Sequence, residues 1–327
     1  MSIKIAVAGA GSIGCYVGGA LALAGHDVQF LARTRIIQAV ARVGALKLSD
    51  YNGLQASVPE PVFTDDLSIL GVADVILVTV KSSATAEIAR LIATHAKPDA
   101  LIISLQNGVG NVSVLRRILP DHDVRAGMVP FNVVPMGDAA YHRATSGEIE
   151  VQAGPLPPLD TTYIGWRSVD NIEAVQWGKL LINLGNALNA LSDLPLLDML
   201  NQRPWRKLMA DQMAEALGIL KANGITPAKT TAVPPNALPF ILRLPTPIFR
   251  RVAAKMLTID PKARSSMWDD LTQGRQTEVD ALQGVIIDLA AKTGKSAALN
   301  SRIRALIRDA ETAGNGPPGL SPADISD

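Results

Sequence analysis

Three polar residues in an otherwise apolar stretch have types and spacing that could support catalysis. Lys179, Asn183 and Asn186 stand at i, i+4 and i+7, so they share one face of a helix predicted over 174–191. No other charged residue occurs from 180 to 192, so a solvated surface stripe explains them poorly. An ammonium group near a ketone can protonate or stabilise the alkoxide that hydride addition creates, and asparagine can hold substrate oxygens. We therefore interpret this face as a functional cluster.

A second group of candidate residues lies further along the chain. Ser266 and Glu278 are about three turns apart in a helix predicted over 265–293, and a bend near Gly274 would let both line one cleft. A helix-capping serine and a solvated glutamate explain the same spacing, so both interpretations stay open.

A glycine-rich turn near the N terminus predicts dinucleotide binding. The turn reads Gly9-Ala10-Gly11-Ser12-Ile13-Gly14, directly after a predicted strand and at the start of a predicted helix. This is the pattern G-x-G-x-x-G, in which glycines permit close approach of a pyrophosphate and the helix N terminus offers free amides. A glycine-rich turn that serves packing alone is the alternative.

The end of the strand predicted over 27–32 indicates which dinucleotide is bound. Enzymes that use NAD usually carry Asp or Glu at this point to accept from the ribose hydroxyls. The chain continues instead with Arg33, and Arg35 follows. A guanidinium group can pair with a 2′-phosphate, so we predict NADPH (NADP+) as the cofactor, against the alternative of surface arginines without a role.

Two later turns should belong to the same site, because ligands bind at the carboxyl ends of parallel strands. Lys81 follows a strand predicted over 75–80, and Asn107 follows one predicted over 100–105. Lys81 could serve cofactor or substrate oxygens, and Asn107 could hold the nicotinamide side. A solvated lysine and an ordinary Asn-Gly turn are the alternatives.

The order of predicted elements indicates two domains. Strands over 3–8, 27–32, 75–80 and 100–105, with weaker candidates over 124–129 and 148–152, alternate with helices such as 12–24 and 82–95. This order predicts a Rossmann domain, a doubly wound and mainly parallel α/β sheet, over 1–168. Helical periodicity dominates later, notably over 174–191, 203–223 and 265–293, and predicts an all-α substrate and catalytic domain over 169–327.

Two segments in the second half of the chain are not predicted to form regular helices. Residues 226–247 contain six prolines and are expected to form a constrained surface excursion or a cap, and not a regular helix. The stretch from about 314 to 327 is rich in Gly, Pro, Ser and Asp, and we expect it to be disordered.

Composition narrows the class of protein. With 31 basic and 30 acidic residues among 327, the chain has no electrostatic reason to bind nucleic acid or an anionic membrane. It contains one cysteine, Cys15, so no internal disulfide can form, and we interpret this thiol as structural. We expect a cytoplasmic protein that handles a small molecule, needs no metal, and could form a homodimer.

Taken in order, these residues resemble the ketopantoate reductase (2-dehydropantoate 2-reductase) family. The resemblance runs from the glycine turn to about Arg304. The shared elements are Gly9-Ala10-Gly11-Ser12-Ile13-Gly14, Arg33, Val80-Lys81, Leu105-Gln106-Asn107-Gly108-Val109-Gly110, Trp177-Gly178-Lys179-Leu180 with Asn183, Ser265-Ser266-Met267 and Gly274-Arg275-Gln276-Thr277-Glu278-Val279-Asp280.

The resemblance implies an activity and a role for each matching residue. The family reduces 2-dehydropantoate to D-pantoate with NADPH, in pantothenate and coenzyme A biosynthesis. Lys179 then corresponds to the general acid on the keto oxygen. Asn183, Ser266 and Glu278 correspond to substrate ligands, Asn107 and Lys81 to residues near the nicotinamide and ribose, and Arg33 to the residue that binds the 2′-phosphate.

The chain departs from the family at a few positions. Ala187 stands where better-known members carry a second substrate asparagine, and Asn186, one residue earlier, could replace it. Residues 127–132 also differ from the Thr-rich segment of the family. These departures leave open an NADP-dependent reductase of another 2-oxo acid on the same fold. A non-catalytic NADPH-binding sensor is the alternative from a different functional class.

Overall fold

The computed structural model describes residues 2–257, 261 and 263–326, and the chain divides into two compact units. The first unit is Met1–Ile172 and the second is Glu173–Asp327. We describe each unit by itself.

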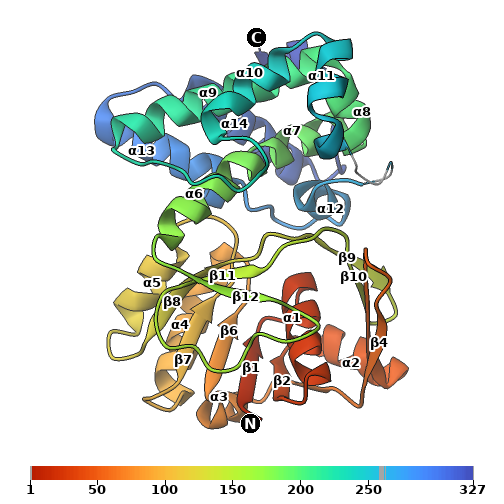
Figure 1. Cartoon of the computed structure of the whole chain (residues 1–327), viewed down its shortest axis with the longest axis vertical. Helices are drawn as coiled ribbons and strands as arrows, with labels where there is room; N and C mark the ends of the chain where they lie inside the picture. Colours follow the sequence, from red (N-terminus) through yellow and green to blue (C-terminus); the bar gives the residue numbers. More distant parts are fainter. Residues whose placement is uncertain (1, 258–260, 262, 327) are drawn as a thin grey trace. The chain divides into compact units, whose positions relative to one another are not determined.

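An eight-stranded sheet forms the centre of the first unit (Figure 1). All neighbouring strands are parallel except β11 and β8, which pair antiparallel. This arrangement confirms the predicted Rossmann fold. In spatial order the strands are β12 (Trp166–Val169), β11 (Ile149–Gln152), β8 (Val124–Met128), β7 (Leu101–Ser104), β6 (Val75–Val78), β1 (Lys4–Ala8), β2 (Asp27–Leu31) and β5 (Val62–Thr64).

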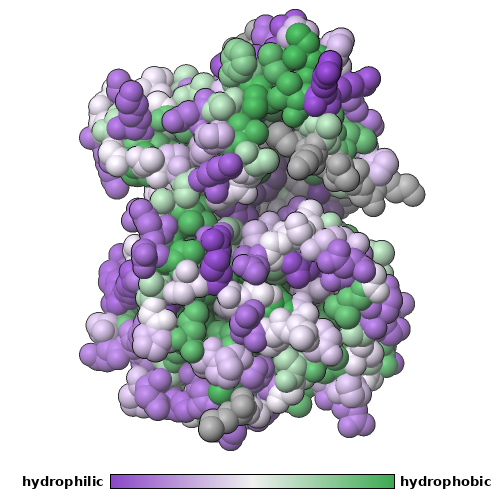
Figure 2. Space-filling model, in the orientation of Figure 1, coloured by the Kyte–Doolittle hydropathy of each residue, from purple (hydrophilic) through white to green (hydrophobic). Residues whose placement is uncertain are grey.

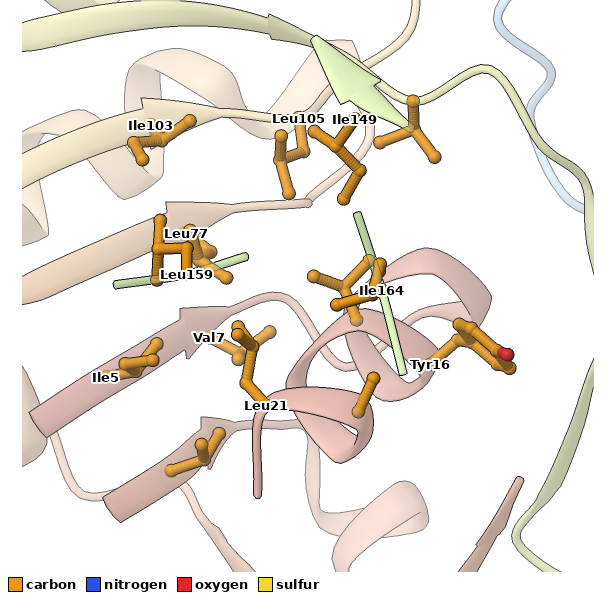
Figure 3. Packing of buried hydrophobic residues seen from close by; sticks show 14 of the residues in the cluster. Ile5, Val7, Tyr16, Leu21, Leu77, Ile103, Leu105, Ile149, Leu159 and Ile164 are labelled. Atoms are coloured by element: carbon orange, nitrogen blue, oxygen red, sulfur yellow. The ribbon is translucent and has the colours of Figure 1, made fainter. Parts of the chain in front are cut away.

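Five helices connect these strands, together with a short 3-10 turn. The connecting elements are α1 (Ser12–Leu23), α2 (Thr34–Val43), α3 (Ser68–Val72), η1 (Ser82–Ala84), α4 (Thr85–His95) and α5 (Asn111–Ile118). Strands β6 and β7 are buried along their whole length, as expected for parallel strands covered on both faces. In Figure 3, Val7 and Leu77 from neighbouring strands belong to the same cluster of buried side chains as Leu21 of α1, and Ile103 lies further along the sheet.

A second sheet, which the sequence patterns do not predict, packs against α1. Its order is β4 (Gln55–Pro59), β3 (Ala45–Asp50), β10 (Ala140–Arg143) and β9 (Val133–Gly137). A Cβ on Gly19 of α1 would lie 2.9 Å from a Leu46 methyl group, so this glycine permits the close approach of helix and sheet. The sheet depends on the parallel pairing of β3 with β10, which are far apart in the chain. Local periodicity in the sequence cannot predict a pairing between such distant strands.

The second unit is helical, as predicted. Its α-helices are α6 (Ile172–Asn183), α7 (Gly185–Ser192), α8 (Leu196–Asn201), α9 (Arg203–Ala222), α10 (Leu238–Arg243), α11 (Thr246–Val252), α12 (Ser266–Thr272), α13 (Val285–Thr293), α14 (Ala298–Ala313) and α15 (Pro322–Ser326). Two 3-10 turns, η2 (Pro235–Ala237) and η3 (Ala254–Leu257), and a π-helical segment, η4 (Asp280–Gly284), complete the described elements.

The prediction of one long helix over 265–293 is wrong. Helix α12 ends at Thr272, and Gly274 adopts a left-handed conformation with φ +61°. A non-helical stretch follows, and the chain becomes helical again only in η4 and α13. The apolar periodicity of this region therefore belongs to two separate helices, α12 and α13. The residues between them do not continue the helix of α12.

The proline-rich segment 226–247 also differs from the prediction, because it contains α10. Three of its six prolines, Pro235, Pro239 and Pro247, lie in the first turns of η2, α10 and α11, where a missing amide hydrogen costs no helical hydrogen bond. Leu238 and Leu242 of α10 are buried against α9, whereas Phe240 is 70% exposed. Figure 2 shows hydrophobic surface over α10 and α11, and Ile248 and Val252 are exposed there as well.

The C-terminal stretch is ordered, in contrast to the disorder expected from about 314. The Leu320 amide donates to the Leu191 carbonyl at 2.8 Å, and Ile325 of α15 is fully buried. This stretch is rich in Gly and Pro, but the buried side chain of Ile325 and the hydrogen bond from Leu320 attach it to the helical unit.

Candidate functional site

The glycine turn joins β1 to α1 and leaves open space on one side. Gly9 has φ +119°, and a Cβ there would lie 2.7 Å from the Val80 amide nitrogen. A Cβ on Gly14 would lie 2.1 Å from the Gly9 carbonyl oxygen. Packing therefore requires both glycines, whatever is bound. A Cβ on Gly11 would meet no atom within 4 Å, so this part of the turn has room for a pyrophosphate to approach the backbone.

Thr79 fastens this turn to the neighbouring strand. Its hydroxyl donates to the Gly9 carbonyl at 2.6 Å, and its amide donates to the Ala8 carbonyl at 2.9 Å. Thr79 is the polar residue of the otherwise apolar strand predicted over 75–80. The structure gives it a role in holding the turn.

Arg33 lies between β2 and α2, and Arg35 lies in the first turn of α2. Arg33 immediately precedes α2, with extended backbone angles of φ −73° and ψ 149°, and both arginine side chains are exposed. The chain carries no Asp or Glu between Asp27 and Asp50, so this strand offers no carboxylate for ribose hydroxyls.

The turns that carry Lys81 and Asn107 are hydrogen-bonded to each other. The Asn107 carbonyl accepts from the Asn111 amide at 2.9 Å and from the Ser82 hydroxyl at 3.3 Å. The Gln106 side chain donates to the Val80 carbonyl at 3.0 Å. Sequence inspection did not identify Asn111, which is buried in the first turn of α5. Strands β7, β6, β1 and β2 are neighbours, so their carboxyl ends bring Asn107, Lys81, the glycine turn and Arg33 to one edge of the sheet.

In the second unit, the structure brings Lys179 and Glu278 together, although 99 positions separate them in the sequence. Burial lowers the pKa of Lys179 from 10.5 to about 8, and the negative charge of Glu278 acts in the opposite direction. Lys179 lies on α6 and is partly buried, and Glu278 lies just before η4. An ammonium that releases its proton near neutral pH is suited to acid catalysis.

Asn183 and Asn186 lie on either side of an interruption in the predicted helix. Helix α6 ends at Asn183 and α7 begins at Gly185, with Leu184 between them in helical backbone angles of φ −55° and ψ −34°. Both asparagines are partly buried, whereas Ala187 is fully buried. Position 187 therefore faces the interior of the unit.

Ser265, and not Ser266, is the residue that caps α12. Its hydroxyl accepts from the Trp268 amide at 3.2 Å and donates to the Asn186 carbonyl at 3.0 Å. The Ser265 amide donates to the Asn189 side-chain oxygen at 2.8 Å. Ser266 begins the helix with an exposed side chain, so a capping role does not account for it. Sequence inspection missed Asn189, whose buried amide links α7 to α12.

Cys15 fits a structural role. It is fully buried in α1, and burial raises the pKa of its thiol to about 12. In the described residues, no cluster of three or more His, Cys, Asp or Glu side chains could hold a metal ion. Across the same residues, no helix is both long and apolar enough to span a membrane.

Comparison with known proteins connects both units to one family. The family model "Ketopantoate reductase PanE/ApbA" matches residues 5–155, and "Ketopantoate reductase PanE/ApbA C terminal" matches residues 171–311. The 2-dehydropantoate 2-reductase of Halobacterium salinarum is 26% identical over an alignment of 306 positions, which covers 88% of this chain and 92% of that protein.

Solved structures extend the comparison to the fold. The PanE/ApbA family ketopantoate reductase of Ralstonia eutropha JMP134 superposes with a TM-score of 0.79 at 28% identity, covering 95% of this chain and 99% of that chain. A D-mandelate dehydrogenase, solved with NADH and anilino(oxo)acetate, has the same fold with a TM-score of 0.76. It is 19% identical, and the match covers 96% of this chain and all of that chain.

Proposed function

Because the chain belongs to the ketopantoate reductase PanE/ApbA family, we propose that it reduces 2-dehydropantoate (ketopantoate) to D-pantoate with NADPH. This step lies on the route to pantothenate and coenzyme A. The observation that carries the proposal is the partly buried Lys179, whose pKa is lowered to about 8 next to Glu278.

Lys179 is the proposed general acid. When bound, NADPH supplies the hydride that adds to the keto carbon. The Lys179 ammonium donates its proton to the keto oxygen as negative charge develops on it, and its positive charge stabilises that oxygen beforehand. Because the pKa of this group is about 8, proton transfer to an alkoxide is more favourable than from an ordinary lysine.

The remaining candidate residues would bind and orient the substrate. Glu278 accepts a hydrogen bond from a substrate hydroxyl, and the amides of Asn183 and Asn186 hold substrate oxygens without adding charge. The exposed hydroxyl of Ser266 donates to the substrate carboxylate. Asn107, at the edge of the first unit's sheet, contributes on the nicotinamide side.

The first unit supports NADPH over NADH. Gly9, Ala10, Gly11, Ser12, Ile13 and Gly14 would hold the pyrophosphate, and Lys81 would contact the ribose. Arg33, assisted by Arg35, would pair with the 2′-phosphate, since β2 ends without a carboxylate.

Turnover measured by NADPH absorbance tests this proposal. Purified protein is assayed with ketopantoate and a panel of other 2-oxo acids, with NADH in place of NADPH as the cofactor control. Fast turnover that requires both ketopantoate and NADPH supports the full assignment. Tight NADPH binding without turnover on any substrate would overturn the enzymatic role and favour a sensor.

A second candidate function is the NADP-dependent reduction of a different 2-oxo acid. It is favoured by Ala187, which is fully buried and leaves the chain without the family's second substrate asparagine at this position. Comparing Glu278→Ala on ketopantoate and on a 2-oxo acid without the distal hydroxyl separates the two. A loss confined to ketopantoate supports hydroxyl recognition by Glu278, and equal losses contradict it.

A further inference from the structure

One buried hydrogen bond joins the two segments that carry Lys179 and Glu278. The Leu184 carbonyl, at the interruption between α6 and α7, accepts from the Gln283 side-chain amide at 2.9 Å. Gln283 lies in η4, the π-helical segment that begins two residues after Glu278. Leu184 lies directly after Asn183 and bonds back to Leu180, the residue next to Lys179, through its amide at 2.9 Å.

Gln283 makes this contact from a π-helical turn. A π-helical turn holds one residue more than an α-helical turn, so it shifts the direction of the side chains around it by about one position. Such segments are rare and occur frequently at functional sites. Here the turn directs Gln283 inward, where it is fully buried.

The surrounding contacts hold η4 in place from its other side. Asp280, its first residue, pairs with Arg304 at 2.7 Å and with Arg308, both on α14. A second glutamine, Gln212 of α9, also donates to the Leu184 carbonyl at 3.3 Å and contacts Asn300 of α14 at 3.4 Å. The hydrogen bond from Gln283 to Leu184 therefore links two segments that each make further contacts, η4 through Asp280 and Leu184 through Gln212.

Stability alone does not account for Gln283. Its side-chain oxygen is buried and has no hydrogen-bond partner among the residues that the structure describes. A buried amide oxygen without a hydrogen-bond partner is destabilising, so an apolar residue of the same size would serve the core at least as well. What the glutamine provides, and an apolar residue does not, is the bond to Leu184.

We propose that Gln283 is a positioning residue that sets the spacing between Lys179 and Glu278 through the Leu184 carbonyl. It touches no reacting atom. The inference depends on the proposed function only for the roles of Lys179 and Glu278, because the spacing itself is a property of the helical unit.

The experiment measures the electrostatic coupling between Lys179 and Glu278 without using turnover. The pKa of Lys179 is followed by NMR of the side-chain carbon in protein labelled with 13C-lysine, and K179R identifies the resonance. Glu278→Gln removes the carboxylate that raises the pKa, so it should lower the pKa of Lys179 in the otherwise native chain. In a Gln283→Met background, Glu278→Gln should lower the pKa of Lys179 by about half as much or less.

Gln212→Met is the matched control. It removes a buried amide donor from the same carbonyl, but Gln212 lies on α9, which carries neither Lys179 nor Glu278. We expect it to destabilise the unit while leaving the coupling intact. Gln283→Asn, which keeps the amide but shortens its reach, provides the same comparison if Gln283→Met does not fold.

Turnover gives a second readout. In Gln283→Met, kcat/KM for ketopantoate should fall on the order of 10- to 100-fold, because a displacement of about 1 Å is enough to cause such a loss. The Kd for NADPH should not change. The proposal is overturned if the electrostatic coupling between Lys179 and Glu278 is the same in both Gln283 variants as in the native chain. It is also overturned if Gln212→Met reduces this coupling as much as Gln283→Met does. An enzyme inactive on ketopantoate in which coupling still depends on Gln283 contradicts the proposed function and supports this inference.

Discussion

At the scale of single residues, the proposed chemistry of this protein centres on the environment of Lys179. Burial disfavours the ammonium form and the Glu278 carboxylate favours it, and the balance brings the pKa to about 8. The same lysine on an exposed helix face would stay protonated and would be a poorer proton donor. Arg33 is the opposite case, an exposed guanidinium whose proposed role depends on its charge and its place at the end of β2.

The pH dependence of reduction follows from the Lys179 environment. Only the protonated amine can donate a proton, so kcat should fall as pH rises through about 8. Glu278→Gln should move this fall to lower pH, because the carboxylate raises the pKa. Steady-state rates across a pH series, with NADPH stability checked in parallel, measure both effects. A rate that stays constant well above pH 8 would rule out Lys179 as the acid.

Arg33→Ala should weaken selection for NADPH. Loss of a charge-assisted pair with the 2′-phosphate should raise KM for NADPH about tenfold or more, with little change for NADH. Arg42→Ala is the control, since Arg42 is an exposed arginine in the last turn of the same helix, α2. Equal effects of the two substitutions on NADPH would contradict a specific role for Arg33.

At the scale of elements, the first unit uses glycine for two separate purposes. Gly14 allows α1 to pack directly against the turn, whereas Gly11 has open space beside it. In the second unit, Ser265 and Asn189 connect α7 to α12 and thereby orient the start of the helix that carries Ser266. These connections between elements position candidate residues that lie far apart in the chain.

Alanine substitutions at Gly14 and Gly11 should therefore have different consequences. A Cβ on Gly14 would lie 2.1 Å from the Gly9 carbonyl oxygen, so Gly14→Ala should lower the melting temperature as well as NADPH affinity. Gly11→Ala should leave the melting temperature nearly unchanged and weaken NADPH binding, because its methyl group points into open space. Thermal unfolding and a binding titration on both variants check this. Full NADPH affinity in Gly11→Ala would show that the pyrophosphate binds elsewhere.

At the scale of the whole molecule, each unit has its own interior and its own stabilising contacts. The first depends on the sheet and α1, with a cluster of apolar side chains between them. In the second, the fully buried Arg206 of α9 donates to the carbonyls of Leu200, Leu242 and Leu244, and its guanidinium lies 4.2 Å from the Phe249 ring centre.

Arg206→Met should therefore destabilise the helical unit without affecting cofactor binding. Two buried carbonyls and one partly buried carbonyl would lose their donor, and the free energy of unfolding should fall by roughly 3 kcal/mol. Chemical denaturation followed by circular dichroism measures this loss, and an NADPH titration below the transition provides the control. A variant as stable as the native chain would mean that other donors or water replace the guanidinium.

The sequence by itself determined the features that arise from contacts close along the chain. The G-x-G-x-x-G turn, the buried strands 75–78 and 101–104 and the shared helical face of Lys179 and Asn183 follow from periodicity and turn chemistry over short stretches. The Rossmann fold of the first unit and the helical character of the second follow from the order of these elements.

Only the tertiary structure decided how distant segments meet. The pairing of β3 with β10, the burial of Ile325 and the proximity of Glu278 to Lys179 each join residues far apart in the chain. The predicted helix 265–293 failed for the same reason: its local pattern was helical, but a left-handed Gly274 and a π-helical turn redirect the chain between two helices. Such contacts depend on the free energy of packing and hydrogen bonding between elements, which a local pattern does not contain.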